Sequence, residues 1–206
     1  PTGDQLRLNT APNGLKTRTL IQTDGTRKVT APDGTMTTTV KGPDPRFNMQ
    51  APFLKNLTIK LPSGLSLEAT AERAVSLANP NDPLSLNSET NTKTLNGKTF
   101  TAIYDAALKQ HTFRSPLNRL GLVRTDMQGR VIQQQVTDIE AVNYGYDTRG
   151  RLISLTQGRG TAARTTSFNY NAEGYLESVT DPTGRMQSYK YDAAGRIKYQ
   201  TLSDDR

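Results

Sequence analysis

The chain has 206 residues, of which 33% are hydrophobic, 6% are aromatic and 29 are threonine. This composition favours half-exposed pleated surfaces over a deep apolar interior. Because there is no cysteine and only one histidine, His111, the sequence excludes disulfides, thiolate zinc sites, cysteine nucleophiles and histidine-based metal clusters. We therefore predict no metal or cofactor site.

The net charge of +7 arises from 26 Lys and Arg against 19 Asp and Glu, and the cations are scattered along the chain. The densest groups are Arg27-Lys28 and the spread of Arg149, Arg151, Arg159 and Arg164. Without a polybasic run or interleaved aromatics, this charge indicates solubility rather than nucleic-acid binding. No segment approaches the roughly 20 apolar residues that cross a bilayer, so we expect no membrane insertion. Residues 1–10 lack the charged-then-apolar pattern of a signal peptide, and we expect none in this segment.

In chain order, the first predicted elements are strands joined at Pro-x-Gly turns. Proline presets the first central φ of such a turn, and glycine accepts the positive φ that ends it. Residues 57–61 and 65–69 alternate apolar and polar side chains on either side of one turn, and period two predicts strands. Four such turns are present: Pro12-Asn13-Gly14, Pro32-Asp33-Gly34, Pro62-Ser63-Gly64 and Pro182-Thr183-Gly184.

Three further segments of the N-terminal half are less regular. Residues 68–78 mix helix-favouring Ala and Glu with an alternating pattern, and we predict a strand there. Residues 42–53 contain Pro43, Pro45 and Pro52, which argue against regular pairing, so we predict a connecting loop. A second loop is predicted over residues 79–83.

A repeated template occupies the C-terminal part, where four glycines are separated by 21, 24 and 21 residues. Asp or Asn at the first turn position and Gly at the fourth are typical of a type I turn with a G1 bulge. Tyr146 should then face Leu152 across the ladder, and Asp147 should face Arg151. The four copies are Thr125-Asp126-Met127-Gln128-Gly129-Arg130-Val131, Tyr146-Asp147-Thr148-Arg149-Gly150-Arg151-Leu152, Tyr170-Asn171-Ala172-Glu173-Gly174-Tyr175-Leu176 and Tyr191-Asp192-Ala193-Ala194-Gly195-Arg196-Ile197.

This Tyr-Asp-x-x-Gly-Arg-Leu unit resembles the YD-repeat family, also called Rhs repeats, which includes bacterial Rhs polymorphic toxins, the C components of insecticidal toxin complexes and teneurin-like barrels. Residues 33–47 and 79–86 also resemble the stretch that precedes such repeats. The resemblance implies a long β-sheet that spirals into a hollow shell, and in bacterial members the shell encloses a toxic C-terminal domain. The family's self-cleaving core region is absent, although residues 181–184 faintly resemble its Asp-Pro-x-Gly element.

We therefore expect an all-β fold: an antiparallel meander of about a dozen short strands, forming a curved strip that is a segment of an Rhs/YD-repeat shell. Residues 1–206 should form one continuous strip, with a divergent part over 1–115 and the YD repeats over 116–206. The resemblance implies a structural, non-enzymatic role in a secreted or cell-surface bacterial protein. The expected partners are the remainder of a longer parent chain, an encapsulated toxin domain and secretion-system or cell-surface components. The alternative is a cell-surface or carbohydrate-binding adhesion module.

Several polar and aromatic residues are candidates for a functional site, and we predict that none is catalytic or metal-binding. Tyrosines before the turns could stack on sugars, but their fixed place favours cross-strand packing. Aspartates beside the turn glycines could form a carboxylate pair, but turn capping explains them better. No serine lies in a Gly-x-Ser-x-Gly elbow, and the Gly158-Arg159-Gly160 tripeptide indicates only a hairpin loop. The residues concerned are Tyr144, Tyr146, Tyr170, Tyr189, Tyr191, Asp105, Asp126, Asp147, Asp192, Ser63, Ser115, Ser154 and His111, the last being read as an ordinary strand residue.

Overall fold

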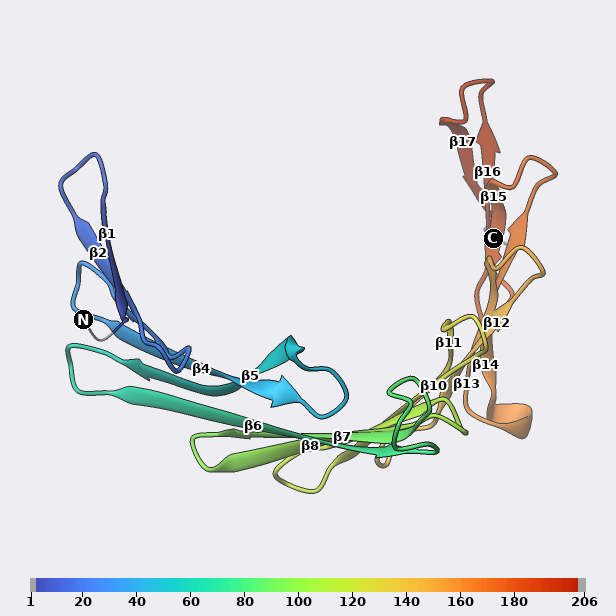
Figure 1. Ribbon diagram of the computed structural model, residues 1–206. Helices are drawn as coiled ribbons and strands as arrows, with labels where there is room; N and C mark the ends of the chain where they lie inside the picture. Colours follow the sequence, from blue (N-terminus) through green and yellow to red (C-terminus); the bar gives the residue numbers. More distant parts are fainter. Residues whose placement is uncertain (1–2, 204–206) are drawn as a thin grey trace. The chain divides into compact units, whose positions relative to one another are not determined.

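The computed structural model describes residues 3–203, which form antiparallel β-structure with one short 3-10 turn, η1 (Gly160–Ala162) (Figure 1). The chain divides into two compact units, one up to Arg119 and one from Leu120. Unit 1 holds β1 (Gln5–Thr10), β2 (Lys16–Ile21), β3 (Arg27–Thr30), β4 (Met36–Asp44), β5 (Asn48–Lys60), β6 (Ser66–Leu77), β7 (Leu86–Leu95), β8 (Lys98–Asp105) and β9 (Gln110–Arg114). Unit 2 holds β10 (Leu120–Thr125), β11 (Val131–Val136), β12 (Val142–Tyr146), β13 (Leu152–Gln157), β14 (Arg164–Tyr170), β15 (Leu176–Thr180), β16 (Met186–Tyr191) and β17 (Ile197–Leu202).

Within each unit, every strand pairs antiparallel with its neighbours in the sequence. The predicted all-β meander of hairpins is therefore confirmed. One detail of the prediction was wrong, because residues 3–203 contain seventeen strands rather than about twelve. The strands are 4 to 13 residues long. The placing of a boundary between a divergent part and YD repeats at residue 115 stays a prediction.

The register gives each unit one polar and one apolar face. In unit 1, directly opposed residues on one face form threonine rows such as Thr70, Thr94 and Thr99, and the hydroxyls of Thr94 and Thr99 lie 3.0 Å apart. The opposite face carries Leu57, Ala69 and Leu95 in one such row. The alternation of β6 places the apolar series on the less exposed side of the sheet, which confirms the predicted strand over residues 68–78.

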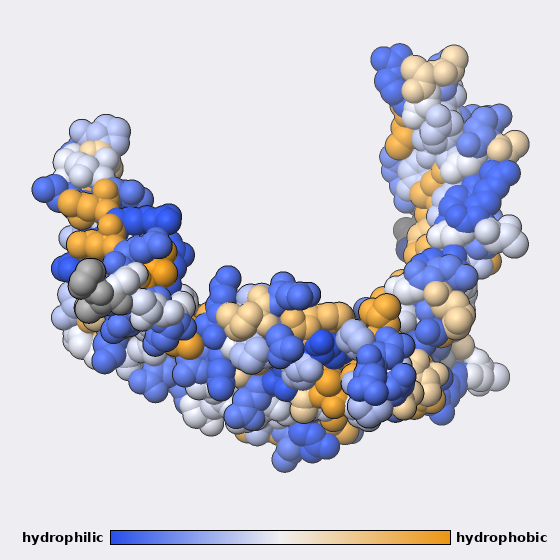
Figure 2. Space-filling view, viewed as in Figure 1, coloured by the Kyte–Doolittle hydropathy of each residue, from blue (hydrophilic) through white to orange (hydrophobic). Residues whose placement is uncertain are grey.

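Within each unit, no second layer covers either face of the sheet in the described residues, so neither unit has more than a minimal core. Ala141 is the only buried hydrophobic residue between 3 and 203. The accessible surface of the chain is 14650 Å², whereas a compact monomer of this mass exposes about 9500 Å². Apolar atoms accordingly reach the surface beside polar ones in both units (Figure 2).

The predicted loop over residues 42–53 was wrong, because β4 and β5 continue through most of it. The register shifts between Gly42 and Asp44, so the ladder skips Pro43, which has no N–H to donate. Pro45 lies in the turn and Pro52 lies within β5. The prolines therefore mark an irregular hairpin rather than an unpaired loop. Residues 79–83 do form a connection between β6 and β7, as predicted.

Candidate functional site

The two kinds of turn in the sequence share one backbone geometry. In the YD turn, Asp147 N donates to Arg151 O at 3.0 Å and Gly150 N donates to Asp147 O at 2.9 Å. The Pro-x-Gly turn of residues 11–15 shows the same two bonds, both at 2.9 Å. In each case glycine holds a positive φ, +81° at Gly150 and at Gly14. The predicted turn with its G1 bulge is thus confirmed, and two different sequence patterns give the same turn geometry.

Each YD turn is capped by the aspartate or asparagine that opens it. Asp147 Oδ1 accepts the N–H groups of Arg149 and Arg151, both at 2.9 Å, and its Oδ2 binds Arg151 Nε at 2.7 Å. Asp126 and Arg130 repeat this ion pair at 2.7 Å, and Asp192 and Arg196 repeat it at 2.8 Å. The predicted turn capping and cross-turn charge pairing are therefore confirmed, as is the facing of Tyr146 and Leu152.

A second set of contacts joins each hairpin to the one before it. The tyrosine that precedes a turn donates its hydroxyl to a backbone carbonyl one hairpin earlier. Tyr146 Oη lies 2.8 Å from Val131 O, Tyr170 Oη lies 2.9 Å from Leu152 O, and Tyr191 Oη lies 2.7 Å from Leu176 O. We call this repeated contact the tyrosine latch. It links hairpins that share only one strand-to-strand ladder.

The residue that follows the turn glycine covers the ring of the next tyrosine. Arg130 Cζ lies 4.7 Å from the ring centroid of Tyr146, and Arg151 Cζ lies 4.4 Å from that of Tyr170. In the third copy, Tyr175 replaces the arginine and its ring stacks on Tyr191 at 4.9 Å. A cation–π contact and a ring stack thus occupy the same place in the repeat.

At two of the YD turns, this cover adds a steric demand for glycine to the demand set by positive φ. A Cβ at Gly195 would lie 2.5 Å from Tyr175 Oη, and one at Gly150 would lie 3.0 Å from Arg130 Nη1. At Gly184, in a Pro-x-Gly turn, a Cβ would meet no atom within 4 Å. Both kinds of glycine need positive φ, but at Gly150 and Gly195 an added Cβ would also lie within 3.0 Å of a side chain of the preceding hairpin.

We expect Gly195→Ala to destabilise the chain more than Gly184→Ala. Both substitutions place alanine at positive φ, with a cost of about 1–2 kcal/mol, and Gly195→Ala must also displace Tyr175, with a further cost of about 1–3 kcal/mol. The midpoints of urea unfolding of the two variants would measure the difference. Equal midpoints would show that Tyr175 does not constrain the turn.

The capping contacts make stability depend on acid pH. The N–H of Arg151 holds the pKa of Asp147 below its usual value, and the N–H and guanidinium of Arg196 do the same for Asp192. A carboxylate with a lowered folded-state pKa stabilises the fold fully above the unfolded pKa of about 3.9, and loses that contribution as pH falls through the folded value.

The urea midpoint should therefore fall steeply below pH 4. The variant with both Asp147→Asn and Asp192→Asn is expected to be less stable at pH 7 and to lose less stability between pH 5 and pH 2. Urea titrations of both proteins at each pH would test this. Parallel curves for the two proteins would mean that these caps do not govern the acid response.

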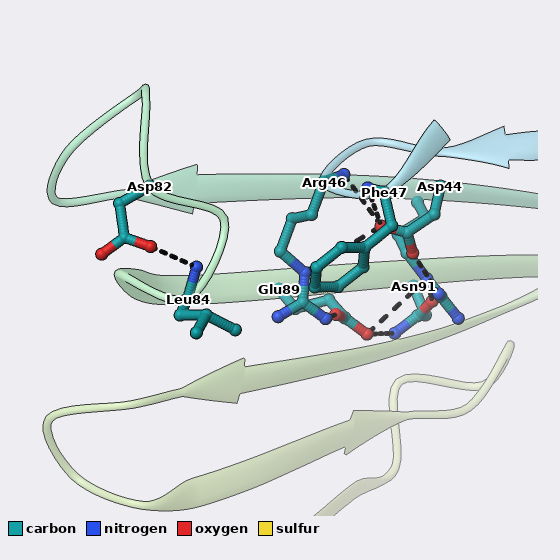
Figure 3. Close-up of polar contacts among 8 residues, drawn as sticks. Asp44, Arg46, Phe47, Asp82, Leu84, Glu89 and Asn91 are labelled. Atoms are coloured by element: carbon teal, nitrogen blue, oxygen red, sulfur yellow. Dashed lines mark hydrogen bonds and ion pairs between the residues drawn. The ribbon is translucent and has the colours of Figure 1, made fainter. Parts of the chain in front are cut away.

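Unit 1 contains a different polar site on its apolar face, built around Asp44 (Figure 3). The Asp44 side chain is only 2% exposed, and it binds Arg73 Nη1 at 2.7 Å and the N–H groups of Arg46 and Phe47 at 2.8 and 3.2 Å. Arg46 reaches Glu89 at 3.0 Å, and Asn91 bonds both Glu89 and Arg73. Two cations and two anions thus form a neutral network.

Opposing effects act on the Asp44 carboxyl. Burial alone would raise its pKa, but the hydrogen bonds from Arg73, Arg46 and Phe47 and the charge of Arg73 hold the pKa below its usual value. Asp44 is therefore ionised at neutral pH. A groove of about 410 Å³ lies beside the network and is lined by residues including Phe53, Leu57, Ala69, Arg73, Leu95 and Phe100.

Comparison with known proteins shows which family the chain belongs to. The sequence matches the teneurin YD-shell family over residues 2–206. The chain belongs to this family. A comparison with curated protein sequences gives no match. As a member of the YD-shell family, the chain is a structural repeat segment, and the resemblance to YD repeats is confirmed.

One solved structure shows a similar fold. The YD-shell chain is similar to a chain in the crystal structure of TcdB2-TccC3-Cdc42, with a TM-score of 0.55 and 12% identity over 95% of this chain. The crystal structure of TcdB2-TccC3 and the structure of the Photorhabdus luminescens Tc holotoxin pore each give a TM-score of 0.44, with 12% and 11% identity over 97% of this chain. The chain spans only 10–12% of the length of these proteins.

The other candidate residues of this YD-shell segment have contacts that are ordinary for residues of strands and turns. Asp105 Oδ1 accepts the N–H of Leu108 in the turn after β8. His111 lies in β9 opposite Tyr104, 4.6 Å between ring centroids, as expected of a strand residue. Ser115 Oγ accepts the N–H of Arg119. Residues 158–160 lead into η1 between β13 and β14.

The contacts of the remaining candidates are also ordinary for residues of strands and turns. Ser63 lies within a Pro-x-Gly turn, and Ser154 lies opposite Gly145. Tyr144 Oη bonds Gln134 Oε1 at 3.0 Å, and Tyr189 lies opposite Gln200. The tyrosines thus pack across strands, as predicted.

Two sets of contacts were not predicted from the sequence. The tyrosine latch joins residues 15 to 18 apart, and nothing in a single hairpin signals it. The Asp44 network does leave a signal in β6, where Arg73 takes its place in an otherwise apolar series between Ala71 and Val75. A charge at such a position indicates a partner on the same face.

Proposed function

We propose that this YD-shell segment is one section of the wall of a hollow β-shell that encloses a toxin domain before delivery. The observation that carries the proposal is the tyrosine latch, which joins hairpin to hairpin and makes a single sheet layer coherent without a core. Family membership supports a shell role, and the similar TcdB2-TccC3-Cdc42 structure supports the fold. The wall acts by separating the enclosed domain from its surroundings.

The size of the sheet supports a wall section rather than a complete container. A folded cargo of 100 residues has a diameter of about 34 Å, and a wall around it needs a circumference of about 140 Å. At about 4.8 Å per strand this is about 29 strands. Residues 3–203 supply seventeen. Further wall would come from the rest of a longer parent chain.

The polar face of each unit suits contact with a cargo that must be released. In unit 2 this face carries paired polar side chains, including Gln133 with Asn143 at 2.9 Å and Thr156 with Thr165 at 2.9 Å. Side chains that bond one another offer little apolar surface to an enclosed chain. We propose no enzymatic activity, a secreted or extracellular site of action, and contact with secretion-system or cell-surface components. Within residues 3–203, no helix has the length and apolar character of a membrane crossing.

Protease protection in the intact parent protein tests the proposal. Cargo inside the intact shell should survive a protease dose that digests free cargo, and Tyr170→Ala, which opens one latch, should shorten that protection. Cargo that is digested at the same rate inside the shell and free would overturn the proposal. Light scattering adds a second test, because a wall section expressed alone should associate rather than stay a stable monomer.

A further inference from the structure

The groove on the apolar face of unit 1 exists because β6 carries small side chains between larger ones. Ala69 lies between Leu57 of β5 and Leu95 of β7 in one row of directly opposed residues. Ala71 is the next residue of β6 on the same face, and it lies opposite Lys93. Two successive alanines therefore leave a furrow along β6 in the middle of the sheet.

The course of β5 widens this furrow. β5 and β6 pair as far as Asn56 with Thr70, and within the described residues no pair joins the two strands beyond that point. Phe53 of β5 instead packs against Arg73 of β6, with 5.2 Å between the guanidinium carbon and the ring centroid. Because Asp44 binds Arg73 at 2.7 Å, contacts within the protein hold this end of the groove in place.

The groove combines an apolar lining with one cation that has no anionic partner. Two cations line it, and Arg73 is paired with Asp44. Lys93 is exposed, and no carboxylate of residues 3–203 lies within ion-pair distance of it. Glu72 also lines the groove, but the alternation of β6 places its side chain on the opposite, more exposed face. The apolar lining includes Phe53, Leu57, Ala69, Ala71, Leu95 and Phe100. Such a lining suits a ligand with an apolar body and a single negative charge.

We propose that this groove binds a single-chain anionic amphiphile, with its carboxylate at Lys93 and its alkyl chain over Ala69, between Leu57 and Leu95. The groove volume of about 410 Å³ falls within the range of about 300–1,000 Å³ that is typical of small-molecule sites. A stable protein–protein contact needs about 800 Å² on each partner, which is more than a groove of this size offers. Amphiphile binding involves neither the polar face nor an enclosed cargo, and is therefore independent of the wall function.

Isothermal titration calorimetry of the chain with octanoate, decanoate and dodecanoate, each below its micelle concentration, tests the apolar part of the site. Binding should saturate at one ligand per chain. Each added CH₂ group should lower Kd about two- to fourfold, because a groove covers the alkyl chain on one side and leaves the other in water. Decan-1-ol, which lacks the charge, should bind about threefold more weakly than decanoate, as expected for an exposed ion pair.

Two pairs of variants locate the site. Ala71→Leu fills the furrow and should weaken decanoate binding at least about tenfold, whereas Ala74→Leu, on the other face of the same strand and opposite Thr90, should leave it unchanged. Lys93→Gln should lower the affinity for decanoate to that for decan-1-ol and leave decan-1-ol binding unchanged. Lys60→Gln, which removes an exposed lysine outside the groove, should alter neither.

Far-UV circular dichroism and the urea midpoint of each variant would show that it is folded. Equal affinity of decanoate and decan-1-ol, equal effects of Ala71→Leu and Ala74→Leu, or binding that begins only at the micelle concentration would each overturn the proposal. If Ala71→Leu did not fold, the loss of charge selectivity in Lys93→Gln alone would decide it. Every readout uses the chain without cargo, so the protease experiment can fail independently.

Discussion

Replacing Tyr170 by alanine is expected to lower the free energy of unfolding by about 3 kcal/mol. The substitution removes the hydroxyl bond to Leu152 O, the ring beneath Arg151 and the cross-strand contact with Leu176. Because the sheet has a single layer, no other group fills the space. Hydrogen exchange should show lost protection in β13 and β14 first, and urea unfolding would give the magnitude.

Two matched variants separate the parts of this effect. Tyr170→Phe keeps the ring and should cost about 1 kcal/mol, the net value of one hydrogen bond. Tyr199→Ala removes a tyrosine that is 57% exposed on the edge strand, and surface positions of this kind change stability by about 0.5 kcal/mol. If Tyr170→Ala were no more harmful than Tyr199→Ala, the latch would not hold the hairpins together.

Replacing Asp44 by alanine should cost about 3–5 kcal/mol, because removing one partner of a buried ion pair leaves uncompensated charge. Arg73 and Arg46 would face each other with Glu89 as their one remaining carboxylate in the network. The N–H groups of Arg46 and Phe47 would also lose their acceptor. The irregular end of the β4–β5 hairpin should then open, and its amide protons should exchange faster.

Asp33→Ala is the control for this substitution. Asp33 also accepts a backbone N–H, that of Thr35 at 2.8 Å, but it lies in an exposed turn. Its loss should therefore shift the thermal midpoint much less than Asp44→Ala. Similar shifts for the two variants would show that Asp44 acts only as a turn cap and that its contacts with Arg73 contribute little.

The hairpins could be predicted because the information that forms them is local. Asp147 and Gly150 lie three residues apart. Asp147 supplies the hydrogen-bond acceptor that the turn needs, and Gly150 adopts its positive φ. The pairing of Tyr146 with Leu152 follows from the length of the turn. For the same reason, alternation in residues 68–78 was sufficient to predict β6.

Contacts between hairpins could not be predicted in this way. In all four YD hairpins the register shifts beside the turn, so the ladder skips Ile132, Ile153, Glu177 and Lys198 in turn. These bulges set where a tyrosine reaches the preceding hairpin, and no residue type marks them. Asp44 and Arg73 were missed because 29 residues separate them, and only the ladder of β4 to β6 brings them together. The prediction of a loop over residues 42–53 was wrong because a bulge accommodates proline, whereas a regular ladder does not.

A sheet one layer thick has a mechanical consequence. Each hairpin of unit 2 is held by its immediate neighbours alone, so a load applied along the chain from the β17 side would meet one latch and one ladder at a time. Freeing a hairpin of 21 residues, the spacing of Gly174 and Gly195, would lengthen the chain by about 70 Å. Extension under tension should therefore proceed as a staircase of near-equal steps, each requiring similar force, rather than as one abrupt rupture.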